Sequence, residues 1–177
     1  MRQTLIATVE NKPGVLNRVA SLFRRRNFNI DSLNVGRTEN PDISRMTIVM
    51  DSSDVSAERV EANLYKLVNV VDVQDVTDMN AVLRELALVK IRAGAEKAAE
   101  VKSVAAIVNG TIADVGKESM IVQIVAPSEE VDSLLDILAP YGIIESVRTG
   151  NVAMTRGVEG GKRHTPNAES ASLNGVG

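Results

Sequence analysis

The chain has 177 residues, of which 44% are hydrophobic and 24% charged, the composition of an ordinary globular protein. This balance excludes wholesale disorder, and no apolar run approaches the ~20 residues that a membrane-spanning helix needs. The formal net charge of −3 and an aromatic content of 2% provide neither an electrostatic footprint nor a stacking surface for nucleic acid.

Cys and His, two residue types common in nucleophilic and metal sites, are almost absent from the chain. There is no Cys, which excludes disulfides, thiolate zinc sites and cysteine nucleophiles. The single His, His164, lies in a stretch rich in Gly, Asn and Ser, so ordinary Ser–His–Asp triads and His-cluster metal sites are excluded as well. The N-terminus carries no secretory signal pattern. We therefore expect a cytoplasmic protein with no catalytic residues and no metal site.

The first 76 residues follow the order strand, helix, strand, strand, helix, strand. Apolar residues recur at i, i+4 and i+7, a helical spacing, at Val15, Val19 and Leu22. A second helix is predicted from about Ser56, with an apolar face that includes Val60. Short β-prone runs predict the strands, at residues 3–10, 29–36, 44–50 and 70–76.

The same order repeats in the second half. Strands are predicted at residues 86–91, 111–115, 120–125 and 143–147. Helical faces lie between them, at Val101, Val104, Ala105 and Val108 and at Val131, Leu134, Leu135 and Leu138. The repeat predicts an α+β protein of two tandem ferredoxin-like βαββαβ sandwiches, each with two helices on one face of a four-stranded antiparallel sheet. We expect domains at 1–78 and 82–156, followed by a disordered, dispensable tail at 157–177.

The segment 11–16, Asn-Lys-Pro-Gly-Val-Leu, joins a strand to the start of a helix. Helix N-termini present unpaired amides and a positive dipole end, which favour an anion. Gly14 has no Cβ, so a ligand can approach the amides of Val15 and Leu16, and Asn11 offers both an amide donor and a carbonyl oxygen. A small zwitterion suits this chemistry, although a plain Asn-Pro-Gly turn is the alternative interpretation.

Several motifs make the chain similar to a known family. Residues 9–11, 13–19 and 22–23 resemble the opening of an ACT domain, the amino-acid-sensing form of the ferredoxin-like fold. Residues 27–35 and 44–49 resemble more narrowly the regulatory (small) subunit of acetolactate synthase, also called acetohydroxyacid synthase. Residues 88–91 and 143–150 resemble the same subunit, so the likeness extends over residues 2–156.

The resemblance implies a non-catalytic subunit that activates a separate catalytic subunit. That partner is expected to carry thiamine diphosphate, a divalent metal (Mg) and FAD, none of which this chain would bind. The resemblance also implies feedback inhibition by a branched-chain amino acid, most often valine, and a homodimer or larger assembly with effector sites at the interface. The effector-binding residues carried over are Asn11, Gly14, Val15 and Leu16 of one chain, with Asn29 and Ile30 of its partner.

Other interpretations stay open at the level of the sequence. Asn29 and Ile30 are equally well explained as the start of a strand that merely pairs with its neighbour. A stand-alone ACT-type sensor acting on another enzyme or a transcription system is the main functional alternative. A small enzyme on a ferredoxin-like scaffold, such as an acylphosphatase, would require a glycine-rich phosphate loop with a nearby Arg, and the sequence has none.

Overall fold

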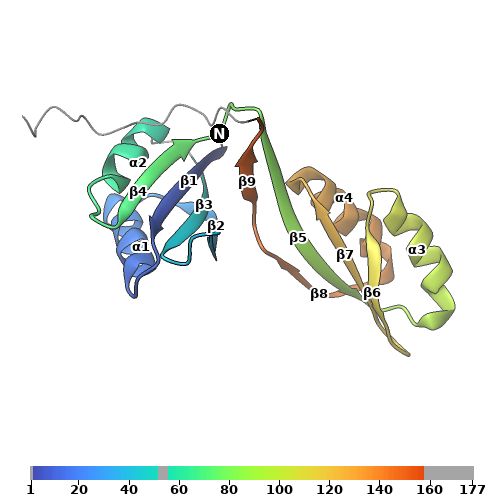
Figure 1. Ribbon diagram of the computed structural model, residues 1–177. Coiled ribbons are helices and arrows are strands. Elements are labelled where there is room, and N and C mark those ends of the chain that lie inside the picture. Colours follow the sequence, from blue (N-terminus) through green and yellow to red (C-terminus); the bar gives the residue numbers. More distant parts are fainter. Residues whose placement is uncertain (1, 52–55, 158–177) are drawn as a thin grey trace, which may run out of the picture. The chain divides into compact units, whose positions relative to one another are not determined.

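The computed structural model describes residues 2–51 and 56–157. The chain forms two compact units, and the second consists mainly of Val82–Met154. Each unit contains one antiparallel sheet and two α-helices packed against one of its faces (Figure 1). The α+β fold with two βαββαβ units predicted from the sequence is confirmed. The predicted tail lies outside the described residues from 158 onward.

The N-terminal unit has the predicted order of elements. They are β1 (Arg2–Glu10), α1 (Val15–Arg26), β2 (Ile30–Arg37), β3 (Ile43–Asp51), α2 (Ala57–Leu64) and β4 (Val70–Asp75). The strand order in the sheet is β2-β3-β1-β4, which leaves β2 and β4 at the edges. Strand β1 pairs antiparallel with β3 and β4. Only residues 38–42 connect β2 and β3, and a connection this short allows only antiparallel pairing.

The core of this unit follows from the alternation of side chains along its strands. On β1, Leu5 pairs with Ile48 and Ala7 pairs with Met46 of β3, and all four are at most 1% exposed. Helix α1 covers them with an apolar stripe that includes Phe23. Full burial of a large aliphatic or aromatic side chain contributes ~1.5–3 kcal/mol, so this layer fixes where α1 lies and therefore where it begins.

The C-terminal unit repeats the pattern with an additional strand. Its elements are β5 (Ala81–Ile91), a 3₁₀ turn (Ala95–Lys97), α3 (Ala98–Ala106), β6 (Thr111–Val115), β7 (Met120–Ala126), α4 (Ser128–Leu138), a second 3₁₀ turn (Ala139–Tyr141), β8 (Ile143–Arg148) and β9 (Val152–Thr155). The strand order is β6-β7-β5-β8, and β9 also pairs with β5, making five strands where four were predicted. The long β5 has room for two partners on the same side, β8 and then β9.

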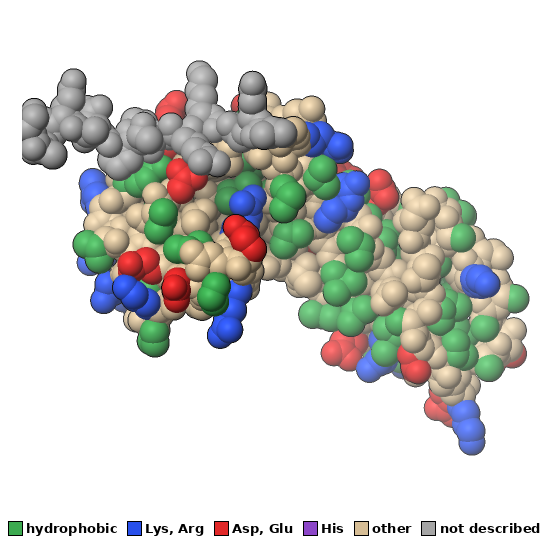
Figure 2. All heavy atoms as spheres, in the orientation of Figure 1, with side chains coloured by type: hydrophobic (Ala, Val, Ile, Leu, Met, Phe, Trp, Pro, Cys, Tyr) green, Lys and Arg blue, Asp and Glu red, His purple; other side chains and the backbone are tan. Residues whose placement is uncertain are grey.

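One face of the second sheet packs on α3 and α4, and the other is open. The buried face alternates along β5 and β7 and includes Val89 and Val122, which face each other and are fully buried. Helix α3 ends at Ala106, and the chain turns away from it at Asn109, which takes a left-handed conformation (φ 60°), while the Gly110 amide donates back to the Ala105 carbonyl at 2.9 Å. On the face in view in Figure 2, charged side chains of both signs are interspersed on each unit.

Candidate functional site

The loop from Asn11 to Gly14 lies at one end of the first sheet, between β1 and α1. Asn11 anchors it to the β2–β3 connection: its backbone amide donates to the Asp42 carbonyl at 2.7 Å, and its side-chain Nδ2 donates to the Pro41 carbonyl at 2.8 Å. One N–H of the Asn11 side chain is therefore used by the fold, whereas its Oδ1 has no partner among residues 2–51 and 56–157.

Gly14 caps α1 in a left-handed conformation, with φ 83° and ψ −8° and no side-chain cap. A Cβ at this position would meet no atom within 4 Å, so the space in front of the helix start is open. The Val15 amide turns back to the Lys12 carbonyl at 3.3 Å. Within the described residues, the next two amides, those of Leu16 and Asn17, have no acceptor. These two amides are the anion-binding donors that the helix start offers.

The two apolar residues of this site have different environments. The Val15 side chain is 4% exposed and belongs to the core, whereas Leu16 is 45% exposed. Any apolar contact with a ligand in front of the helix therefore comes from Leu16. The Val15 amide, which the sequence suggested as a donor, is bonded to Lys12, so the donors on offer begin at Leu16.

Asn29 and Ile30 lie at the opposite end of the same sheet. Ile30 is the first residue of β2 and Asn29 immediately precedes it, and β2 runs parallel to β1 because both strands are antiparallel to β3. Next to them, the Asp31 carboxylate lies 3.4 Å from the Arg2 guanidinium, at the start of β1. At ~3.3 Å per residue, β1 separates that end from the loop by about 25 Å. One chain thus brings Asn11, Gly14, Val15 and Leu16 together but does not bring Asn29 and Ile30 to them.

A polar network behind the loop was not predicted from the sequence. Asn69, immediately before β4, donates from Nδ2 to Glu10 Oε2 at 2.5 Å and accepts at Oδ1 from Arg18 Nη1 at 2.6 Å. Lys12 Nζ lies 3.1 Å from the other Glu10 carboxylate oxygen. The hydrogen bonds from Asn69 and then Lys12 hold the pKa of Glu10 below its ordinary value. In the sequence, Asn69 is recognisable only as a turn-forming residue before a strand, and that does not indicate which residues it would bond.

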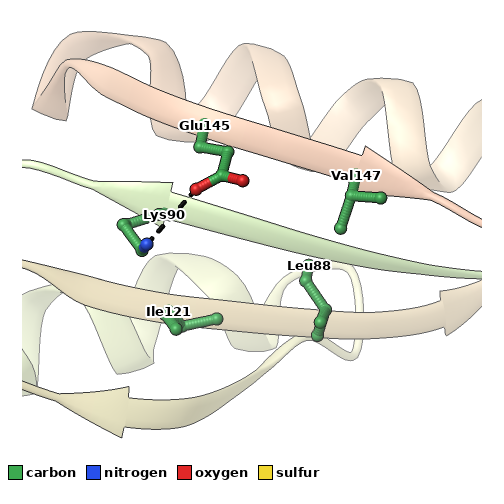
Figure 3. A pocket seen from close by; sticks show the side chains of 5 residues that line it. All are labelled: Leu88, Lys90, Ile121, Glu145 and Val147. Carbon is green, nitrogen blue, oxygen red and sulfur yellow. Dashed lines mark hydrogen bonds and ion pairs between the residues drawn. The ribbon is translucent and has the colours of Figure 1, made fainter.

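The open face of the second sheet carries a pocket of about 180 Å³ (Figure 3). Leu88, Ile121 and Val147 contribute apolar side chains, and Lys90 Nζ lies 3.2 Å from Glu145 Oε2. The two charged groups that line this pocket are paired with each other, so neither is left to bind the carboxylate or ammonium of an amino acid. We assign no ligand to it.

A partly buried ionic cluster lies at the end of β8. The Arg148 guanidinium donates to Glu85, which is 4% exposed, and to Asp132 of α4 at 2.5 Å. Burial alone would lower the pKa of Arg148, but the hydrogen bonds to Glu85 and Asp132 outweigh it and raise the pKa. Arg148 thereby joins β5, β8 and α4, which is a structural role.

Two further searches of residues 2–51 and 56–157 give negative results. No group of three or more His, Asp or Glu side chains there has a geometry that would hold a metal ion. No helix in the same ranges has the length and apolar character required to cross a membrane.

The fold and the loop at the start of α1 define a class of proteins, those with an ACT domain followed by a second ferredoxin-like domain. Residues 5–72 match the model of the AHAS small subunit-like ACT domain, and residues 84–157 match that of the small subunit of acetolactate synthase.

Individual relatives are similar to this chain over almost its whole length. A probable acetolactate synthase small subunit of Archaeoglobus fulgidus is 45% identical over 157 residues, which cover 89% of this chain and 98% of that protein. The acetolactate synthase small subunit of Bacillus subtilis is 36% identical over 160 residues, covering 90% and 93%. The crystal structure of the acetolactate synthase small subunit from Thermotoga maritima, 38% identical, matches with a TM-score of 0.80 over 89% of this chain and 98% of that one. The chain belongs to the acetolactate synthase small subunits and is a non-catalytic regulatory subunit.

Proposed function

We propose that this chain activates the thiamine-dependent catalytic subunit of acetolactate synthase and makes it sensitive to feedback by a branched-chain amino acid, with valine the first candidate. Membership in the small-subunit family supports a catalytic subunit as the partner. Thiamine diphosphate, Mg and FAD would stay on that subunit, and the complex would work in the cytoplasm. We place the ACT domain at residues 1–78 and the second domain at 82–156, consistent with the two matched ranges.

The main support for an effector site shared between two chains is that the loop before α1 lies at one end of the first sheet, whereas Asn29 and Ile30 lie at the other end. Strand β2 is at an edge of the sheet, and the unpaired backbone groups of an edge strand can form hydrogen bonds with a strand of a second chain. If β2 pairs antiparallel with β2 of a second copy, the start of one β2 lies beside the end of the other. The end of β2 is next to the loop, since Asn11 is bonded to Pro41 and Asp42 just beyond it. A two-fold dimer would therefore bring Asn29 and Ile30 of one copy to the loop of the other, twice.

The loop's chemistry fits a zwitterion with a branched apolar side chain. The amides of Leu16 and Asn17 would receive the carboxylate in the space that Gly14 leaves open. The Oδ1 of Asn11, which has no partner among the described residues, would accept from the ammonium group, since the bond from Nδ2 to Pro41 fixes which way the amide points. The exposed Leu16 side chain would contact the effector's aliphatic group.

An acetolactate synthase assay tests this function directly. The purified catalytic subunit is measured with and without this chain, and the complex is titrated with valine, leucine and isoleucine. We expect the chain to raise acetolactate formation and to add inhibition by at least one of the three. A chain that neither binds nor activates the catalytic subunit would favour a stand-alone sensor instead.

The dimer is tested separately by sedimentation of the isolated chain. We expect a species of at least twice the 19.0 kDa chain mass at micromolar concentration. A monomer alone under those conditions would remove the shared site, since one chain holds only half of it.

A further inference from the structure

The side chain of Asn69 connects the two ends of the loop between β1 and α1. Its Nδ2 holds the carboxylate of Glu10, the last residue of β1, at 2.5 Å, and its Oδ1 holds the guanidinium of Arg18, on the first turn of α1, at 2.6 Å. Its backbone carbonyl also accepts the Glu10 amide at 2.8 Å. Asn69 itself is 9% exposed, whereas Glu10 and Arg18 reach the surface, so only the Asn69 end of these bonds is buried. Both polar ends of one buried amide are thus committed to the two residues that flank the loop.

Arg18 transmits this constraint to the helix start. Its backbone amide donates to the Gly14 carbonyl at 3.0 Å, which closes the first turn of α1. Its side chain is held by Asn69 at the same time. A glycine in a left-handed conformation is otherwise among the freest points of a chain, and a loop that must become ordered on binding weakens binding.

We propose that Asn69 is a positioning residue for the effector loop, holding Glu10 and Arg18 so that the amides in front of α1 are arranged before the effector arrives. This proposal rests on the proposed effector site, and it adds a residue outside the set of ligand contacts. When only a fraction of the molecules has a competent loop, the apparent Kd rises by the inverse of that fraction.

The experiment compares two buried asparagines. Asn69→Ala removes both bonds to the loop's ends. Asn63→Ala is the matched control: Asn63 is 5% exposed on α2, its Nδ2 bonds only to the Arg59 carbonyl at 2.7 Å, and its Oδ1 has no partner among the described residues. The readouts on the full chain are calorimetric titration with valine, leucine and isoleucine, hydrogen exchange of the amides of residues 11–18 without ligand, and thermal melting.

We expect Asn69→Ala to raise the Kd about tenfold, the result if one molecule in about ten keeps a competent loop, and to accelerate exchange at residues 11–18. Asn63→Ala should leave the Kd within about twofold and the exchange of residues 11–18 unchanged, even if it lowers the melting temperature. Equal effects of the two variants, or an unchanged Kd and exchange in a folded Asn69→Ala protein, would overturn the proposal.

A polarity swap covers the case in which the alanine variant does not fold. Asn69→Asp keeps an acceptor for Arg18 but places a second carboxylate against Glu10, and it should loosen the loop. Adding Glu10→Gln restores a hydrogen bond between the two positions, because the new amide at position 10 donates to the new carboxylate at position 69. The Kd and the exchange rates should then return to within about threefold of those of the unaltered chain. A double variant no better than Asn69→Asp alone would contradict the proposal. If the unaltered chain binds none of the three amino acids, the proposed effector site fails, while the exchange rates still decide whether Asn69 fixes the loop.

Discussion

Replacement of Gly14 by Asp is the sharpest test of where the effector's carboxylate lies. The new Cβ would meet no atom within 4 Å, so the substitution adds a negative charge without a steric clash. The φ of 83° imposes a backbone cost of about 1 kcal/mol on a residue with a side chain, smallest for Asn and Asp. Gly14→Asn is therefore the matched control, because it has the same conformational cost and nearly the same volume without the charge.

The expected loss of valine affinity in Gly14→Asp follows from the Coulomb repulsion between the new carboxylate and that of the effector. Two unit negative charges about 4 Å apart repel by about 4 kcal/mol at an effective dielectric constant of 20. Because 1.4 kcal/mol is a factor of ten, even a third of this repulsion weakens binding about tenfold. We expect Gly14→Asp to lose valine inhibition by tenfold or more and Gly14→Asn to lose much less, while both still activate the catalytic subunit.

The assay is acetolactate formation by the catalytic subunit saturated with each variant, titrated with valine, with thermal melting as the check on folding. A folded Gly14→Asp protein with full valine sensitivity would refute the proposed site. Equal losses for Asp and Asn would show that bulk or backbone strain, and not charge, governs binding there.

Three further predictions concern ionic groups. Arg148→Met should lower the free energy of unfolding by about 3 kcal/mol in urea titrations, because it leaves the carboxylate of Glu85, 4% exposed, without its cation; a loss below about 1 kcal/mol would mean that water reaches Glu85. Lys90→Met should change the same quantity by less than about 1 kcal/mol, since the side chains of Lys90 and Glu145 are 38% and 67% exposed. Glu10 has a lowered folded pKa, so its contribution is present above its ordinary pKa of 4.5 and is lost as pH falls through the folded value. Stability should therefore fall more steeply below about pH 5 in the unaltered chain than in Glu10→Gln, and identical slopes would contradict this.

Most helices and strands could be predicted from the sequence because the spacing of apolar residues indicates which face of a helix or strand is buried. Val15, Val19 and Leu22 marked the buried stripe of α1, and all three are at most 6% exposed. Strand β9 was missed because four residues, Val152–Thr155, are too short for alternation to stand out. Their strand conformation depends on the length of β5, a tertiary effect that local sequence does not carry.

The candidate site was predictable only in its local part. The Pro-Gly sequence before an apolar helix pointed to an open helix start, and Gly14 has the positive φ that only glycine adopts easily. Asn69 lies 51 residues from Arg18 and 59 from Glu10 in the chain, and no spacing rule connects positions so far apart. That the available donors are the amides of Leu16 and Asn17, and not that of Val15, also required knowing that the Val15 amide points to Lys12.

The separation of Asn29 from the loop by the length of β1 has a genetic consequence. In the proposed dimer each site takes its loop from one chain and its Asn29 from the other. A mixed dimer of one Gly14→Asp chain and one Asn29→Ala chain then contains one site with both changes and one site with neither. Two variants that each abolish valine control on their own should therefore restore part of it when they are produced together in one cell. A site built within a single chain would show no such complementation.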